Sequence, residues 1–209
     1  MGSFFFLERG MRFLLKTAML LDAINDRIGR MMMWCILAAT LIGAGNAVVR
    51  KAVGVSSNAW LEVQWYLFAA VFMLGGGYAF LRNVHVRIDF LSSRFSPRVR
   101  NVVDLIGILA FVFPLCWLMV SLGWPVFERA WLTGEMSSNA GGLIRWPAYL
   151  LVPAGFTLLM AQGLSEIVKR LAFLTGHGPD VLAQKVPDDA EALARDLAQE
   201  AQSSAAGKA

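Results

Sequence analysis

The chain has 209 residues, of which 57% are hydrophobic and 16% charged, and its formal net charge is +4. Soluble globular domains contain about 25% charged residues, so this composition excludes an ordinary soluble domain. The positive charge does not indicate nucleic-acid binding, because no basic stripe or aromatic platform stands on a soluble region. The apolar residues form long blocks that match the roughly 30 Å hydrocarbon core of a bilayer, which predicts an all-α membrane protein.

The first predicted element is an amphipathic helix at the end of the N-terminal segment 1–27. In MRFLLKTAMLLDAINDRI (11–28), large apolar residues share one arc of a helix and polar residues share the opposite arc. Arg12 and Lys16 belong to the polar arc and are expected to meet lipid headgroups. The pattern favours a helix lying in the cytoplasmic interface before the first span; the alternative is that the segment simply lengthens that span.

Four apolar blocks predict four transmembrane helices, each about 33 Å long and able to cross the bilayer with some tilt. Pro114 lies inside the third block and is expected to kink it. The transmembrane domain is expected over 28–172 and a polar cytoplasmic tail over 173–209. The four predicted spans are 28–49, 60–81, 102–123 and 147–168.

Basic residues are divided unequally between the two sides of these spans. Twelve lie in the N-terminal segment, in the loop after the second span and at the end of the fourth span. Because lysine and arginine in short loops favour the cytoplasm, both termini are predicted to be cytoplasmic. The opposite side has only four basic residues, Arg50, Lys51, Arg129 and Arg145.

Three acidic residues stand near the ends of the predicted spans. Asp104 opens the third span and Glu166 lies near the cytoplasmic end of the fourth, where water or the helix dipole lowers the cost of the charge. Both are interpreted as helix-end groups of that kind. Glu62 is flanked by Trp60 and Trp65, so a contact with another protein is at least as good an explanation for it.

No acidic residue lies near the centre of a span, which disfavours a self-sufficient four-helix exporter of small molecules. Both histidines, His85 and His177, lie outside the spans, which disfavours a haem or other redox subunit. No cofactor or metal site is predicted. A membrane scaffold unrelated to transport stays open as an alternative.

The second block ends in a concentrated polar motif, FLRNVHVRIDFL (80–91). In a helix or tight turn, His85 and Asp89 lie at positions i and i+4 and can form a hydrogen bond. Arg82, Arg87 and Arg94 are expected to meet lipid phosphates or acidic groups of a partner. A basic cytoplasmic loop explains the arginines of this motif but not His85 and Asp89.

Taken in order, several short motifs resemble the small membrane subunit, of the DctQ type, of tripartite ATP-independent periplasmic (TRAP) transporters. The resemblance covers about residues 28–175. The motifs are Trp60 and Glu62 at the start of the second span, Gly75 to Gly77, the stretch HVRIDFL (85–91) with His85, Arg87, Asp89 and Leu91, GEMSS (134–138), RWPAYLLVP (145–153) and the stretch from Gln162 to Glu166.

The resemblance implies a non-enzymatic role in a bacterial inner membrane. In this family a separate large permease subunit holds the substrate and ion sites and moves like an elevator, and a periplasmic binding protein delivers the substrate, usually a small organic acid. The small subunit is expected to brace the permease and to help receive the binding protein. The residues expected to contact these partners are Trp60, Glu62, Trp65, Glu135 and Trp146.

Overall fold

The computed structural model describes residues 2–54, 57–83 and 95–181 of the chain. Within these ranges the secondary structure is helical, apart from an isolated antiparallel bridge between Met136 and Ile144. Four helical segments are long and apolar enough to cross a membrane. The predicted all-α membrane fold with four transmembrane helices is therefore confirmed.

Helix α1 (Gly2–Val53) is one continuous helix of 52 residues. A helix of that length extends for about 78 Å, more than twice the thickness of the hydrocarbon core. A separate interfacial helix before the first span is therefore not confirmed. Gly29 lies at the predicted junction, but a Cβ there would be 2.1 Å from Cγ of Tyr78. This glycine allows close packing of α1 on α2 and does not interrupt the helix.

The second and fourth spans begin close to their predicted positions. Helix α2 (Asn58–Leu81) starts two residues before the expected residue 60, and α6 (Trp146–Leu174) starts one residue before the expected residue 147. Helix α6 continues six residues past the expected end at 168. It is the helix with the most buried residues in the described bundle.

The third helical run is longer than predicted and contains a change of helix type. It consists of α4 (Pro97–Gly107), the π-helical turn η1 (Ile108–Val112) and α5 (Phe113–Thr133). Pro114 has no N–H to donate within the helix. The wider π-helical turn stands directly before this proline, with the Phe113 N–H donating to the Ile108 carbonyl. The irregularity expected at Pro114 is thus a π-helical turn.

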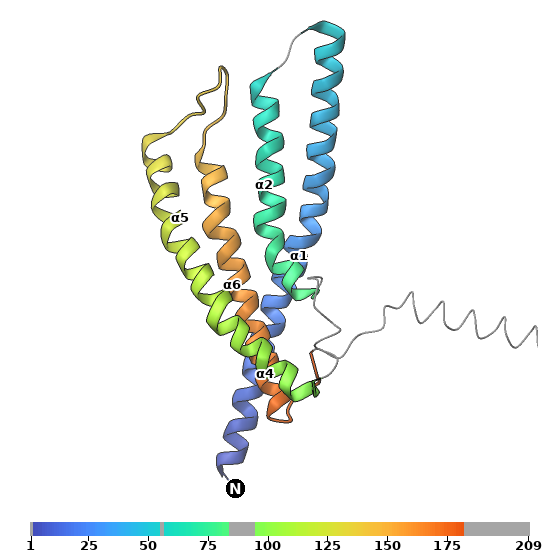
Figure 1. Cartoon of the computed structure of the whole chain (residues 1–209), viewed down its shortest axis with the longest axis vertical. Coiled ribbons are helices and arrows are strands. Elements are labelled where there is room, and N and C mark those ends of the chain that lie inside the picture. Colours follow the sequence, from blue (N-terminus) through green and yellow to red (C-terminus); the bar gives the residue numbers. More distant parts are fainter. Residues whose placement is uncertain (1, 55–56, 84–94, 182–209) are drawn as a thin grey trace, which may run out of the picture.

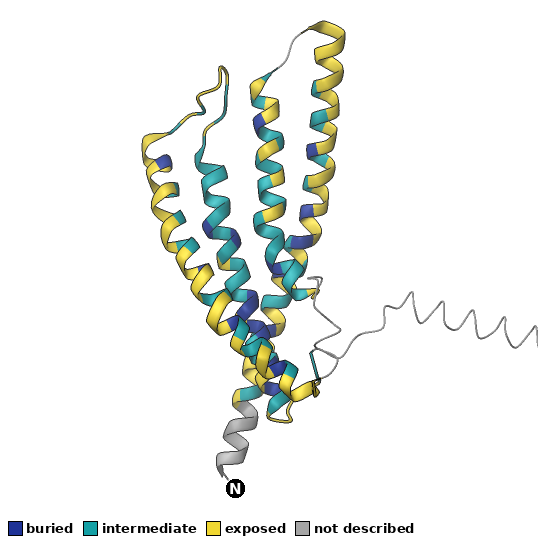
Figure 2. Ribbon diagram, viewed as in Figure 1, coloured by how far each residue is buried: buried dark blue, intermediate teal, exposed yellow. Residues whose placement is uncertain are grey.

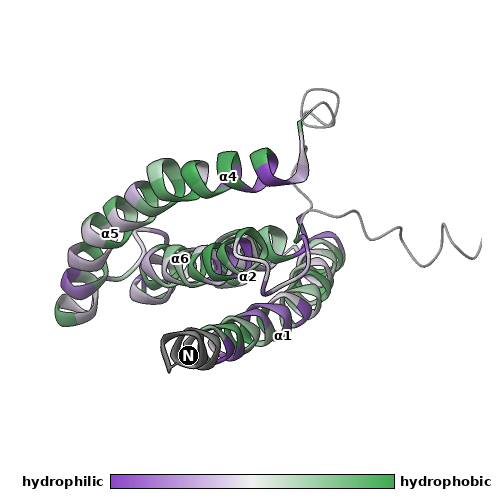
Figure 3. Cartoon of the chain, turned by 90° about the horizontal axis from the view of Figure 1, so that it is seen from below, coloured by the Kyte–Doolittle hydropathy of each residue, from purple (hydrophilic) through white to green (hydrophobic). Residues whose placement is uncertain are grey.

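The helices form three layers. Helices α2 and α6 lie in the middle, with α1 packed on one side and α4 and α5 on the other (Figure 3). They converge at one end, here called the base (around 18–26, 97–104 and 162–174), and splay toward the opposite loop end (50–60 and 129–146) (Figure 1). Buried residues are concentrated at the base (Figure 2).

Most of the predicted polar motif after α2 lies outside the described residues. His85, Arg87, Asp89 and Arg94 lie outside the described residues, as does the tail from residue 182 onward. Their predicted roles stay predictions.

Candidate functional site

Residues 134–145 join α5 to α6 at the loop end and form a short hairpin, here called the α5–α6 hairpin. The Ser137 N–H donates to the Leu143 carbonyl at 2.8 Å, and the Arg145 N–H donates to the Glu135 carbonyl at 2.9 Å. Together with the bridge between Met136 and Ile144, these bonds pair the two arms of the hairpin.

The carboxylate of Glu62 on α2 accepts three hydrogen bonds from this hairpin. One oxygen accepts from the Ser137 hydroxyl and, at 2.7 Å, from the Asn139 amide; the other accepts from the Leu143 N–H at 2.6 Å. Glu62 is only 4% exposed. A Cβ on Gly142 would lie 2.9 Å from the Glu62 carboxylate, so a residue without a side chain allows the hairpin to close over this group.

Two further side chains of α2 hold the hairpin. The Asn58 amide donates to the Ala140 carbonyl at 3.0 Å, and the Tyr66 hydroxyl donates to the Ile144 carbonyl at 3.1 Å. Asn58, Glu62 and Tyr66 are spaced four residues apart, so they lie on one face of α2. That spacing was available in the sequence, but nothing in the sequence indicated that the hairpin is its partner.

The start of α6 is tied to the hairpin by Arg145. Its guanidinium donates to the Glu135 carboxylate at 3.1 Å and lies 3.4 Å from the Tyr149 hydroxyl. The hydrogen bond to Glu135 raises the pKa of Arg145 above its ordinary value, with a further contribution from Tyr149. Glu135, predicted to contact a partner protein, therefore already has a cationic partner within the chain.

Aromatic rings connect α5 to α6 just below the hairpin. The rings of Trp131 and Trp146 meet edge to face, with centroids 4.6 Å apart. Phe127 contacts both Trp146 and Trp124. Edge-to-face ring pairs are favourable arrangements, and they restrain the splayed ends of the two helices.

At the base, polar side chains connect α1 to α6. The Asn25 amide donates to the Gln162 side chain at 3.0 Å, and Gln162 donates to Asp22 at 2.8 Å. The Ser165 hydroxyl donates to Asp22 at 2.6 Å, and the Lys169 ammonium lies 3.0 Å from the same carboxylate. Hydrogen-bonded partners of this kind are what a buried polar group requires.

The same network continues through Glu166 to α4. Glu166 forms ion pairs with Lys169 and Arg170, and Arg170 lies 3.1 Å from the Asp104 carboxylate. Glu166 is 4% exposed and Arg170 is 1% exposed. The interpretation of Glu166 as a helix-end group that reaches water is therefore wrong: two basic residues of α6 neutralise it inside the bundle.

Residues 39–173 match the family model for the DctQ component of tripartite ATP-independent periplasmic transporters. The matched range is more than half of the chain, and it contains the α5–α6 hairpin, its anchors on α2 and most of α6. The chain belongs to the DctQ family. It is therefore a small multi-pass membrane subunit of a transporter and not an enzyme, and the resemblance inferred from the short motifs is confirmed. No curated protein gives a significant match to the chain.

Members of the DctQ family work with a large permease subunit and a periplasmic binding protein. Two of the tryptophans predicted to face these partners are exposed on α2 of this DctQ chain: Trp60 is 55% exposed and Trp65 is 62% exposed. Trp146 is half-buried in the aromatic contacts between α5 and α6. Trp60 and Trp65 are five residues apart and lie on different faces of the helix.

Arg82, predicted to meet lipid headgroups, has partners within this DctQ chain. Its guanidinium forms an ion pair with Asp26 of α1 and lies 5.3 Å from the centre of the Tyr78 ring. The hydrogen bond to Asp26 raises the pKa of Arg82. Arg12 and Lys16 are exposed on α1, so their predicted contact with lipid headgroups stays a prediction.

The described residues of this DctQ chain offer no metal centre: no three His, Cys, Asp or Glu side chains among them are grouped closely enough to hold an ion. Cys35 and Cys116 are free thiols, and Cys116 is buried. The polar groups at both ends of the bundle hold helices and the hairpin in place.

Proposed function

We propose that this DctQ chain braces the large, elevator-type permease subunit and helps dock the periplasmic binding protein during ion-gradient-driven uptake of a small organic acid. We place it in a bacterial inner membrane with both termini in the cytoplasm. The twelve-to-four distribution of basic residues supports this orientation, because the side richer in lysine and arginine includes the base of the bundle.

The docking role is supported by one observation: side chains on one face of α2 hold the α5–α6 hairpin in place. A loop that is already ordered loses less conformational entropy when a partner binds it. The tip of this hairpin is exposed at residues 138–141, and Met136 is exposed beside it. Its two arms are joined by hydrogen bonds, and Glu62 holds it from below. The hairpin therefore offers an ordered surface to a soluble partner.

The bracing role is supported by a stripe of large apolar side chains on α2. Leu61, Trp65, Phe68 and Phe72 are spaced by four, three and four residues, so they share one face of the helix. All four are exposed in the isolated chain, and Phe72 is 75% exposed. Van der Waals packing is one of the forces that associate helices in membranes. We place the permease subunit against this stripe, with Trp65 in the contact.

Transport by the isolated chain is disfavoured by where its polar groups lie. Moving an organic anion with coupling ions needs polar or broken-helix sites near the bilayer midplane. Among the described residues, the buried polar and charged side chains lie toward the two ends of the bundle: Glu62 at the loop end, and Asn25, Asn101, Gln162, Ser165, Glu166 and Arg170 toward the base.

The docking role is tested with Ala140→Arg at the exposed tip of the hairpin, in vesicles containing both membrane subunits. The substitution is expected to raise the concentration of loaded binding protein needed for half-maximal uptake by about tenfold, with the maximal rate unchanged. The matched control is Ala52→Arg, an exposed alanine near the end of α1. Equal concentration dependence for the two variants contradicts docking at the hairpin.

A further inference from the structure

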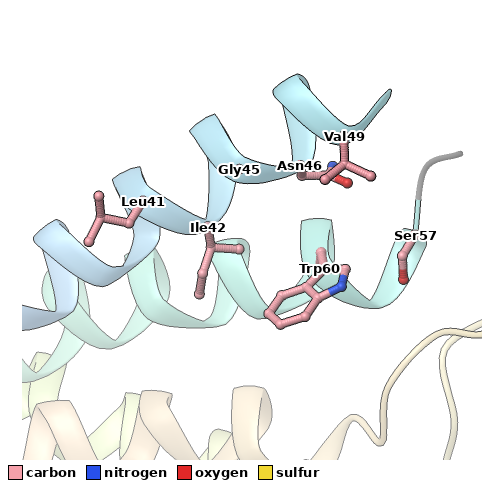
Figure 4. Close-up of a pocket in the computed structure, with 7 residues that line it drawn as sticks. All are labelled: Leu41, Ile42, Gly45, Asn46, Val49, Ser57 and Trp60. Atoms are coloured by element: carbon pink, nitrogen blue, oxygen red, sulfur yellow. The ribbon is translucent and has the colours of Figure 1, made fainter. Parts of the chain in front are cut away.

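A groove of about 490 Å³ lies between α1 and α2 near the loop end of the bundle (Figure 4). Its walls are mostly apolar, and it is separate from the α5–α6 hairpin and from the stripe on α2 that carries Trp65. The residues that line it are Leu41, Ile42, Gly45, Asn46, Val49, Ser57 and Trp60.

The length of this groove matches that of one lipid acyl chain. From Leu41 to Val49, α1 rises by about 12 Å, close to the roughly 15 Å depth of the hydrocarbon in one leaflet. The groove therefore matches the part of a lipid that lies within one leaflet.

Polar atoms are found toward the outer end of the groove. Leu41 and Ile42 line the end that points into the membrane, whereas Asn46 and Ser57 lie near the connection between α1 and α2 (Figure 4). The indole of Trp60 crosses the groove with its nitrogen on the side of Ser57 (Figure 4). Amide, hydroxyl and indole groups at this depth can donate hydrogen bonds to the ester oxygens of a lipid.

An exposed basic residue, Arg50, follows directly after the last groove-lining residue of α1, Val49. Arg50 also follows Asn46 by four residues, so it extends the Asn46 edge of the groove by one turn. Within the part of the chain that the structure describes, Arg50 has no ion-pair partner. Its charge is complementary to a lipid phosphate.

We infer that the groove binds one anionic phospholipid from the leaflet on the side of the loop end. An acyl chain lies along Leu41, Gly45 and Val49, and the phosphate lies at Arg50. This inference does not depend on the proposed docking or bracing role, because it concerns only the membrane-facing surface between α1 and α2.

The test uses the fluorescence of Trp60 in the complex of this chain with its permease subunit. The complex is placed in phosphatidylcholine vesicles, and brominated phosphatidylglycerol or brominated phosphatidylcholine is added in increasing fractions. The difference between the native chain and Trp60→Phe isolates the contribution of Trp60. We compare the fraction of each brominated lipid that quenches Trp60 half-maximally. This fraction is expected to be about fivefold or more lower for phosphatidylglycerol than for phosphatidylcholine.

Four variants show whether the preference comes from the groove. Arg50→Ala is expected to reduce the ratio between the two half-maximal lipid fractions to about one, whereas Arg129→Ala, at an exposed basic residue on α5, leaves that ratio unchanged. Gly45→Leu is expected to fill the groove and abolish the preference. A Cβ at Gly45 meets nothing within 4 Å, and the same holds at Gly76. Gly76→Leu is therefore the matched control, and it is expected to keep the preference.

Equal quenching by the two brominated lipids overturns the inference, as does an unchanged preference in the Gly45→Leu variant. Protection of Trp60 from both lipids in the complex also overturns it, because the permease subunit then occupies the groove.

Discussion

The base and the loop end of this DctQ chain are held together by different chemistry. At the base, charged side chains from α1, α4 and α6 form a buried network of ion pairs and hydrogen bonds. At the loop end, the buried carboxylate of Glu62 accepts hydrogen bonds from neutral donors of the α5–α6 hairpin, and the ion pair there, between Arg145 and Glu135, is partly exposed. The base thus fixes how three helices pack, whereas the loop end fixes the shape of one exposed surface.

The distribution of buried residues agrees with this difference. Of the eight buried residues of α6, six lie between residues 162 and 172, at the base. Helix α2, which carries the anchors of the hairpin, has only Glu62 and Gly77 buried. Substitutions at the base are therefore expected to affect the whole bundle, and substitutions at the loop end are expected to act locally.

The largest effect is expected from Arg170→Ala. The substitution leaves Glu166 buried with only Lys169 as a cationic partner, and breaking a buried ion pair in this way typically costs about 3–5 kcal/mol. Thermal unfolding of the purified subunit in detergent measures the loss. Arg98→Ala, at an exposed arginine near the start of α4, serves as the control and is expected to unfold at the native temperature.

A companion variant keeps this prediction testable if Arg170→Ala does not fold. Replacing both partners, with Arg170→Met and Glu166→Leu, removes the buried charges together and is expected to recover much of the stability. Equal unfolding temperatures for Arg170→Ala and Arg98→Ala contradict the assignment of the base network as the main support of the fold.

An intermediate effect is expected from Gly155→Ala, at the contact between α6 and α2. A Cβ at this position would lie 2.4 Å from the Met73 carbonyl oxygen, so the two backbones must separate. Overpacking of this kind typically costs about 1–3 kcal/mol. At Gly75 a Cβ meets nothing within 4 Å, so Gly75→Ala is the matched control. An equal effect of both variants on the unfolding temperature contradicts the close approach of α2 and α6.

The smallest effect on global stability is expected from Glu62→Gln. An amide keeps the shape of the side chain but presents an NH₂ group to donors of the hairpin, so at least one hydrogen bond is lost. Exchange of the Leu143 amide hydrogen is expected to accelerate by about tenfold, because its acceptor is weakened. Amides of α6 at the base keep their native exchange rates. Faster exchange at both ends contradicts the separation of the two regions.

The four helices long and apolar enough to span a membrane could be predicted from sequence, because each contains an apolar block as long as the bilayer is thick. The length of α1 could not be predicted in the same way. The charges in residues 12–27 suggested a separate surface helix, but no proline interrupts α1, and Gly29 packs against Tyr78. Hydrophobic periodicity does not show whether the change from an amphipathic to an apolar segment is also a break in the helix.

The partners of the acidic residues were also beyond prediction. Glu62 is bonded to residues 75 to 81 positions later in the chain, and Arg170 reaches an aspartate 66 positions earlier. From the sequence, the position of Glu166 near a helix end was enough to explain its charge. Its buried partners became apparent only from the packing of α1 and α4 on α6. Residues that contact a permease or a binding protein have those partners in another chain, so the structure of one chain does not identify them.

We propose that this DctQ chain supports a transporter without transporting anything by itself, and reconstitution separates these two possibilities. The purified chain is placed alone in vesicles under an ion gradient, and uptake of small organic acids is measured. We expect no gradient-driven uptake from the chain alone, and restored uptake when the large permease subunit and the loaded binding protein are added. Robust uptake by the isolated chain contradicts the account.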